Sequence, residues 1–250
     1  MSEGVPDGPD LRCISWNIHR CKGNDGLFDP ERTQRILINE VCRPDTDALI
    51  LQEADGDFPP HEGLLNITEI ERSTGLRYAH PDIQHRWSER SHGFLGVIFF
   101  LHPDIRVESI ELVDLPGRCH RGAVVAELCR EGKKFRLIGT HLSLSQALRL
   151  AQMRTISQHI FRKESKPTIL VGDLNEWRPW GGLALSPKLL GQTFIGPAKA
   201  TFPINRPFLP LDRALAIAPA RVVETEVLDG AGIRVASDHR PLSAHIRLGG

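Results

Sequence analysis

Carboxylate and amide side chains follow one of the most apolar segments of this sequence. Residues 168–171, Thr-Ile-Leu-Val, lie between Pro167 and Gly172, a pattern that predicts a short strand buried on both faces. Such a strand would present Asp173 and Asn175 at the rim of a sheet. A carboxylate can accept a proton or bind a cation, and an amide both donates and accepts hydrogen bonds, so the pair suits holding a water molecule against an electrophile. The alternative is an Asx-turn that closes the strand, the usual role of such loop residues.

The same placement recurs along the chain. Polar residues that follow a predicted strand are Asn17 after residues 11–16, Glu53 after 48–52 and His141 after 135–140, and those at or just before a strand start are Asp212, Asp238 and His239. If neighbouring strands run antiparallel, the end of one and the start of the next lie on the same sheet edge. All eight polar side chains could therefore converge, although each one alone is more often a hydrogen-bonded turn residue.

The donor types predict metal-assisted hydrolysis of a phosphate ester. Oxygen donors such as Asn17, Glu53 and Asp238 suit a hard cation, Mg²⁺ or Mn²⁺, better than zinc, which favours Cys and His. We expect Asp173 and Asn175 to align and deprotonate the attacking water. The sequence contains no Gly-x-Ser-x-Gly motif and no glycine-rich phosphate loop that would indicate a different chemistry.

One histidine extends this chemistry. His239 follows Asp238 directly, and a second carboxylate stands at Asp212. An imidazole that is oriented by a carboxylate can contact a phosphoryl oxygen or the leaving group. We expect Asp212 to accept a hydrogen bond from His239, to fix its tautomer and to favour its protonated form.

Helices and further strands must hold these residues in place. Asp29, Pro30 and Glu31 have the form of a helix start, and the apolar spacing of residues 145–161 predicts an amphipathic helix. Another helix is expected at residues 66–74. Closely spaced strands with antiparallel pairing are expected at 96–101, 107–113, 123–129 and 135–140, and further strands at 211–217, 221–227 and 242–247. We expect residues 78–91 to form a long loop, and such loops in compact domains are usually functional or mobile.

Composition bounds the class of protein. The chain has 250 residues, of which 40% are hydrophobic, and a formal net charge of +0. We expect one domain over residues 11–250 behind a flexible tail at residues 1–10. The tail lacks the apolar core of a secretory signal, and no apolar run approaches the roughly 18–20 residues that span a bilayer, so we expect a cytoplasmic protein without a transmembrane segment. A monomer is favoured, and zero net charge gives no global argument for nucleic acid as a partner.

Other conspicuous residue types have ordinary interpretations. An odd number of cysteines without a Cys-x-x-Cys pair favours reduced thiols, here Cys13, Cys21, Cys42, Cys119 and Cys129. The spacing of His80, His85 and His92 is too irregular for a metal site, so we expect solvated loop histidines. Trp177 and Trp180 could form a substrate wall or could simply pack a turn.

Six motifs together give the sequence a family resemblance. In order they are Ser15-Trp16-Asn17, Leu51-Gln52-Glu53, Gly139-Thr140-His141-Leu142, Gly172-Asp173-Leu174-Asn175, Leu211-Asp212-Arg213 and Ser237-Asp238-His239-Arg240-Pro241-Leu242. With these motifs the chain resembles the endonuclease/exonuclease/phosphatase superfamily, which has the DNase I-like fold. The resemblance runs from end to end, and six matches in order are far more specific than any one of them.

The resemblance implies a fold and a set of roles. The fold is α+β, a four-layer α/β/β/α sandwich of two mostly antiparallel sheets. The implied roles are Asn17, Glu53 and Asp238 toward the metal, Asp173 and Asn175 toward the attacking water, His141 toward the phosphate or leaving group, and His239, oriented by Asp212, toward the remaining phosphate contact.

Departures from the family pattern bear on the substrate. Where many relatives show a Gly-Asn-Ala-type motif, residues 92–97 read His-Gly-Phe-Leu-Gly-Val, and Arg213 replaces the aromatic residue common in the DNA-repair branch. The chain therefore looks more like the compact bacterial branch. We expect a phosphodiesterase acting on a small molecule or lipid headgroup; a Mg²⁺-dependent nuclease acting on DNA or RNA is the alternative, and a catalytically silent scaffold is the second alternative. Substrate selection is expected in residues 78–91 and 177–180.

Overall fold

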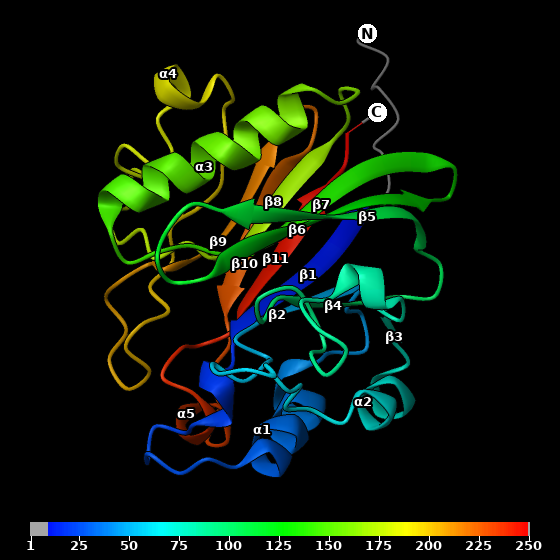
Figure 1. The fold of residues 1–250 in the computed structure, drawn as a ribbon, viewed down its shortest axis with the longest axis vertical. Coiled ribbons are helices and arrows are strands. Elements are labelled where there is room, and N and C mark those ends of the chain that lie inside the picture. Colours follow the sequence, from blue (N-terminus) through cyan, green and yellow to red (C-terminus); the bar gives the residue numbers. More distant parts are fainter. Residues whose placement is uncertain (1–9, 250) are drawn as a thin grey trace, which may run out of the picture.

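Two facing β-sheets form the centre of the computed structural model, which describes residues 10–249 (Figure 1). The first sheet has the order β10 (Arg221–Val227), β11 (Leu242–Arg247), β1 (Asp10–Asn17), β2 (Ala48–Gln52), β4 (Ile98–Leu101) and β3 (Arg77–Tyr78). The second has the order β5 (Arg106–Leu115), β6 (Arg121–Arg130), β7 (Lys133–His141), β8 (Thr168–Asp173) and β9 (Asp212–Ile217). Residues 1–9 of the predicted tail lie outside the described residues. Asp10, which we assigned to the tail, is instead the first residue of β1.

Helices cover the outer faces of both sheets. On the side of the second sheet lie α3 (Gln146–Phe161) and the short α4 (Pro187–Leu190), and on the side of the first lie α1 (Pro30–Ile36), α2 (Ile67–Thr74) and α5 (Ile233–Ala236) (Figure 1). A π-helical turn at Leu37–Val41 continues α1. This order of layers confirms the α/β/β/α sandwich.

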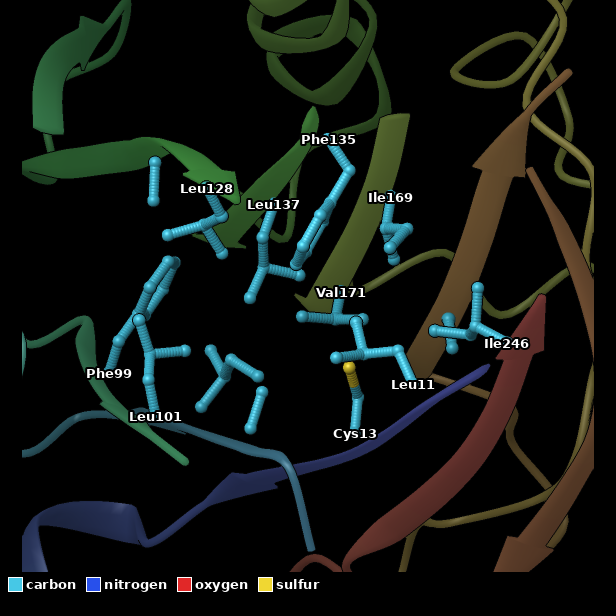
Figure 2. Close-up of a cluster of buried hydrophobic side chains, with 14 of the residues drawn as sticks. Leu11, Cys13, Phe99, Leu101, Leu128, Phe135, Leu137, Ile169, Val171 and Ile246 are labelled. Atoms are coloured by element: carbon cyan, nitrogen blue, oxygen red, sulfur yellow. The ribbon is translucent and has the colours of Figure 1, made fainter. Parts of the chain in front are cut away.

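Three apolar clusters hold the four layers together. The central cluster joins the inner faces of the sheets, with Leu11 and Phe99 on one side and Phe135 and Val171 on the other (Figure 2). A second cluster packs Trp16 and its neighbours against α1, α2 and α5, and a third packs the outer face of the second sheet against α3. Because β8 contributes to both faces of its sheet, every residue from Thr168 to Asp173 is buried, as its apolar run predicts.

Each sheet is antiparallel except for one parallel pair, and these two pairs matter most for the site. They are β1 with β2 and β7 with β8. The expected run of antiparallel neighbours is wrong at one point, because β4 does not pair with β5. It lies between β2 and β3 in the first sheet, while β5, β6 and β7 form the antiparallel run of the second. A short spacing in the sequence cannot show which of two stacked sheets a strand joins.

The predicted helix starts are present. The side chain of Asp29 caps α1 by accepting a hydrogen bond from the backbone N–H of Arg32, with Pro30 at the first helical position. Asn66 caps α2 in the same way. Among the described residues, no helix combines the length and apolarity that crossing a membrane requires.

The segment 78–91 is more ordered than predicted. Tyr78 belongs to β3, and Ile83–His85 form a 3₁₀ turn. His80 is fully buried, so its interpretation as a solvated loop histidine is wrong. Its Nε2 accepts the backbone N–H of Phe99 in β4 at 3.1 Å, and its Nδ1 donates to the carbonyl of His85 at 3.0 Å. Beyond the end of β3, the imidazole ring thus takes the place of a backbone carbonyl as the acceptor for the N–H of Phe99. The five cysteines are free thiols, as expected.

Candidate active site

Six strands, three from each sheet, bring the predicted polar residues to one edge of the sandwich. Strands β1, β2, β7 and β8 end there, and their antiparallel neighbours β9 and β11 begin there. Asp173, the last residue of β8, is paired in register with His141 of β7 and with Asp212 of β9. The other predicted residues are Asn17 at the end of β1, Glu53 after β2, Asn175 after β8, and Asp238 and His239 before β11. We call this set of eight residues the active edge.

Asp173 is the carboxylate at which the two sheets meet. Its Oδ2 accepts a hydrogen bond from Nδ2 of Asn17 at 3.0 Å, across the space between the sheets, and lies 3.3 Å from Nε2 of His141. Its Oδ1 accepts the backbone N–H of Asn175 at 2.9 Å. Burial raises the pKa of Asp173 to about 6, against the lowering effect of His239. The carboxylate is therefore more basic than an ordinary aspartate.

Gly172 allows this position. Its φ of 143° lies outside the range that other residues readily adopt, and a Cβ atom built on it would stand 1.9 Å from the carbonyl oxygen of Thr140 in β7. Strands β7 and β8 can therefore approach closely just before their ends. The sequence motif Gly172-Asp173 thus has a steric cause in the sheet.

His239 and Asp212 form the hydrogen-bonded pair that the sequence predicted. Nδ1 of His239 lies 2.9 Å from Oδ2 of Asp212, which also accepts the hydroxyl of Thr201 at 2.5 Å. Burial alone would lower the pKa of His239, but Asp212 and Asp173 outweigh it and raise the pKa to about 10. The ring is therefore a cation at neutral pH. It packs against the ring of Phe202 with centroids 4.9 Å apart.

His141 has the opposite protonation. A guanidinium N–H of Arg121 donates to Nδ1 of His141 at 2.8 Å, and because arginine cannot accept, this nitrogen carries no proton. Burial, together with the positive charge of Arg121, lowers the pKa of His141 well below its usual value. The ring is therefore neutral, with its proton on Nε2 facing Asp173.

Glu53 is held at the active edge by an unusual backbone conformation. Its φ is 59°, in the left-handed region that a glutamate rarely adopts. The Oε2 atom accepts a hydrogen bond from Arg20 at 2.7 Å. The Oε1 atom lies 3.7 Å from Nδ1 of His141, which has no proton to give, and it accepts no hydrogen bond from the described residues. One carboxylate oxygen is thus left for another ligand.

Oxygen atoms of three residues fit a hard divalent cation. Besides Glu53, these are Asp238 and Asn17. The Oδ1 atom of Asp238 is buried 3.6 Å from Nδ1 of His19 and has no hydrogen-bond partner within residues 10–249. The Oδ1 atom of Asn17 accepts the backbone N–H of His19 at 2.9 Å, which fixes the amide with its oxygen away from Asp173. Two carboxylates and one amide oxygen form the type of donor set that Mg²⁺ and Mn²⁺ prefer.

A second group could also hold a metal ion. Ligand atoms of Asp173, Asp212 and His239 lie within 4.8 Å of one another, and all three side chains are buried. A protonated imidazole offers no lone pair, and Nδ1 of His239 is already engaged by Asp212. This group therefore consists of the hydrogen-bonded pair and the neighbouring carboxylate of Asp173.

Several residues of the site escaped the sequence analysis. His19, Arg20 and Cys21 have successive φ angles of 48°, 48° and 58°, and this left-handed turn after β1 directs Arg20 onto Glu53. Arg121 reaches His141 from the start of β6. No motif marks these residues, because a lone arginine after a strand or in a hairpin resembles an ordinary surface residue.

Arg213 has a structural role that explains its departure from the family pattern. Its buried guanidinium donates to the backbone carbonyls of Pro210 at 2.7 Å and Arg178 at 2.8 Å. These bonds hold the loop that follows Asn175. Trp177 and Trp180 of this loop are exposed, at 48% and 75%. Neither tryptophan lines the pocket that opens beside the active edge.

Comparison with known proteins agrees with this geometry. None of the curated proteins matches the chain. Among solved structures, an endonuclease/exonuclease/phosphatase from Bacteroides vulgatus is 15% identical with a TM-score of 0.72, over 96% of this chain and 99% of that one. The human Nocturnin catalytic domain with a bound sulfate anion is 20% identical with a TM-score of 0.69, over 97% and 96%. D. rerio TDP2 in complex with a single-strand DNA product is 16% identical with a TM-score of 0.66, over 95% and 98%.

These structural likenesses show a shared fold. The sequence model named Endonuclease/Exonuclease/phosphatase family matches residues 14–239, a stretch that begins within β1 and ends at His239. It includes all eight residues of the active edge. The chain therefore belongs to the endonuclease/exonuclease/phosphatase family.

Proposed function

We propose that this protein is a divalent-metal-dependent phosphodiesterase that acts on a small-molecule or lipid-headgroup diester. Members of its family are generally hydrolases of phosphate esters and include nucleases. The observation that carries the proposal is the arrangement around Asp173. This basic, buried carboxylate accepts a hydrogen bond from the amide nitrogen of Asn17 at 3.0 Å and lies 3.3 Å from His141 and 3.8 Å from the cationic His239.

Asp173 is suited to activate the attacking water. A general base works best when its pKa lies near the working pH, and burial raises the pKa of Asp173 to about 6. At neutral pH it is mostly ionised and can still take up a proton. Asn175 fixes one carboxylate oxygen through its backbone N–H, and its side-chain Nδ2 donates to the carbonyl of Leu142 at 3.0 Å. The amide oxygen of Asn175 therefore has a fixed direction in which to align the water.

His239 is suited to stabilise negative charge on the phosphate. Its Nε2 lies 3.8 Å from Asp173 and 4.0 Å from Asp238, so its proton makes no short hydrogen bond to either. A fixed cationic donor of this kind stabilises charge as it develops on a phosphoryl oxygen. Asp212 supports the cation from the opposite side of the ring. In this proposal the neutral His141 provides a second N–H donor near Asp173.

Glu53, Asp238 and Asn17 would hold the metal ion. The support for this assignment is that Glu53 and Asp238 each keep a carboxylate oxygen without a hydrogen bond among the described residues, and that a backbone N–H fixes the amide oxygen of Asn17. A bound Mg²⁺ or Mn²⁺ supplies a Lewis acid that polarises the phosphoryl group.

A nuclease is the second candidate. Three arginines, Arg20, Arg118 and Arg121, line a pocket beside the active edge and could contact a nucleic-acid backbone. They share that pocket with three carboxylates, however, and the chain has a formal net charge of +0. This balance favours a small substrate over a polyanion. A silent scaffold, the third candidate, would have no use for a base with a raised pKa beside a cationic donor.

A panel of substrates tests the proposal. Metal-stripped protein would be assayed before and after addition of Mg²⁺ or Mn²⁺ on bis-p-nitrophenyl phosphate, on soluble and lipid-headgroup diesters, and on single- and double-stranded DNA and RNA. We expect metal-dependent hydrolysis with the highest kcat/KM on small or headgroup diesters. A preference for nucleic acid would establish the second candidate, and no hydrolysis of any ester would establish the scaffold.

A further inference from the structure

A pocket of about 350 Å³ opens directly beside the active edge. It shares Glu53 with that edge, and two of its arginines contact active-edge residues, Arg20 through Glu53 and Arg121 through His141. Pockets for small molecules have volumes of about 300–1,000 Å³, so this one is large enough for part of a small-molecule substrate. A substituent of a phosphate ester bound at the active edge can therefore extend into this pocket.

The positive charges of the pocket are not all compensated. Arg20 is neutralised by Glu53 and by Asp57, at 2.7 and 2.9 Å. Both oxygens of Asp55 accept hydrogen bonds from backbone N–H groups, those of residues 92, 93 and 96. Arg118 and Arg121 have no carboxylate within salt-bridge distance among the described residues.

Arg121 also lacks a hydrogen-bond partner for part of its guanidinium. Among the described residues, its buried Nε has no acceptor, and its one side-chain hydrogen bond goes to Nδ1 of His141. Glu53 and Asp173 act on the charge of Arg121 only from beyond salt-bridge distance, whereas a phosphate would accept two parallel N–H groups from a guanidinium directly. Arg118, exposed and three residues earlier in the same hairpin, has its charge free for the same anion.

An aromatic cluster lies beside the hairpin. Trp87, 37% exposed, lines the pocket, with ring centroids 5.5 Å from His120 and 6.0 Å from His61. The backbone N–H of Trp87 donates to the carbonyl of Gly93 at 2.8 Å, which fixes this part of segment 78–91. A fixed indole beside two imidazoles offers flat surfaces against which a planar ring can pack.

We propose that the substrate is nucleotide-like and carries a second phosphate beside the scissile phosphodiester, with Arg118 and Arg121 binding the second phosphate and Trp87 packing against the base. This inference rests on the proposed function and names the substrate class within it. It also assigns a role to segment 78–91 and gives none to residues 177–180.

Direct binding tests the second phosphate without relying on turnover. Isothermal titration would compare thymidine 3′,5′-bisphosphate with thymidine 3′-phosphate, in the presence of Mg²⁺. We expect the bisphosphate to bind at least about tenfold more tightly, since two guanidinium groups meet the added phosphate. Arg118→Gln should bring the ratio of the two Kd values closer to one, because only Arg121 remains to bind the added phosphate, and Arg118→Lys should give a ratio between those of Arg118→Gln and wild type. Arg154→Gln, which changes an exposed arginine on α3, should leave the ratio unchanged.

A cyclitol ligand tests the ring. Inositol 1,4-bisphosphate carries two phosphates without a base, so we expect it to bind more weakly than thymidine 3′,5′-bisphosphate, and Trp87→Leu should remove most of that difference. Equal Kd values for the two thymidine phosphates in wild-type protein would overturn the phosphate assignment. Inositol bisphosphate binding as tightly as the nucleotide would overturn the ring assignment.

Activity separates this inference from the proposed function. If bis-p-nitrophenyl phosphate is hydrolysed but the second phosphate adds no affinity, the inference is wrong and the proposed function stands. If the bisphosphate binds as expected but no ester is hydrolysed, the proposed function is wrong.

Discussion

A histidine held between two carboxylates gives the active edge its positive charge. His239 donates to Asp212 through one ring nitrogen and faces Asp173 with the other. Residues 212 and 239 are far apart in sequence and meet because β9 and β11 both begin at this edge. If the pair works as a unit, removal of either residue should also remove the contribution of the other to kcat.

Mutation of the pair tests this coupling. We expect His239→Ala to lower kcat by about 10²–10³, the usual effect of removing a preorganised donor. Asp212→Asn should cost less, because the imidazole remains but is poorly oriented. The double variant should lose little more than His239→Ala alone. Asp104→Asn, at an exposed position, serves as the control. A double variant whose loss equals the product of the two single losses would show that the residues act independently.

Glu53 should act chiefly on metal affinity. Its Oε1 atom accepts no hydrogen bond from the part of the chain that the structure describes, and a carboxylate oxygen is a ligand that hard divalent cations prefer. We expect Glu53→Ala to weaken Mn²⁺ binding by at least about tenfold, as loss of a metal-site residue commonly does. Electron paramagnetic resonance of free Mn²⁺ measures this without an assay of activity. Glu62→Ala, at an exposed position in the same loop, should bind Mn²⁺ as the wild type does. Equal affinity in Glu53→Ala would remove Glu53 from the metal site.

The sequence located side chains at strand ends but not the arginines that complete the site. Asn17, Asp173 and His239 stand beside recognisable apolar strands, so their common edge follows from strand direction. Arg20 and Arg121 depend on a left-handed turn and on the facing of two sheets. Neither feature leaves a periodic pattern in the sequence.

At the scale of elements, a buried side chain fixes the start of segment 78–91. His80 accepts the N–H of Phe99 and donates to the carbonyl of His85, so its ring must be neutral. Burial lowers the pKa of His80 to about 4. The sequence analysis placed this histidine in solvent because a single buried residue after a two-residue strand produces no periodic pattern of apolar residues.

His80 should make stability depend on pH. Its pKa in the folded state is below the value of about 6.5 in the unfolded chain, so the unfolded state takes up a proton first as the pH falls. The stability is therefore fully present above about pH 6.5 and decreases toward about pH 4. When the pH is lowered from about 7.5 to 5, this residue alone should decrease the free energy of unfolding by about 2 kcal/mol.

Urea unfolding at the two pH values measures this effect. His80→Gln, which can still donate and accept, should show a smaller loss between them than wild type. His102→Gln, at a partly exposed histidine, should lose as much as wild type. If His80→Gln were as sensitive to pH as the wild type, another group would have to be responsible.

At the scale of the whole molecule, the order of strands and helices was largely predictable. The helix at residues 146–161, the buried run of β8 and the caps at Asp29 and Asn66 all have local causes in the sequence. The division of strands between two stacked sheets has none, and β4 was therefore assigned to the wrong neighbours. The sandwich matters for function because Asn17 from one sheet and Asp173 from the other meet only when both sheets stack.

Hydrolysis of bis-p-nitrophenyl phosphate by wild type and by Asp173→Asn, each with and without Mg²⁺, is the most direct test of the active edge. Metal-stripped wild type should be inactive and should recover with Mg²⁺. Asp173→Asn should remain folded by circular dichroism and lose about 10²–10⁴ in kcat with the metal present, as expected for loss of a general base. Full activity in metal-stripped wild type, or undiminished activity in Asp173→Asn, would contradict the account.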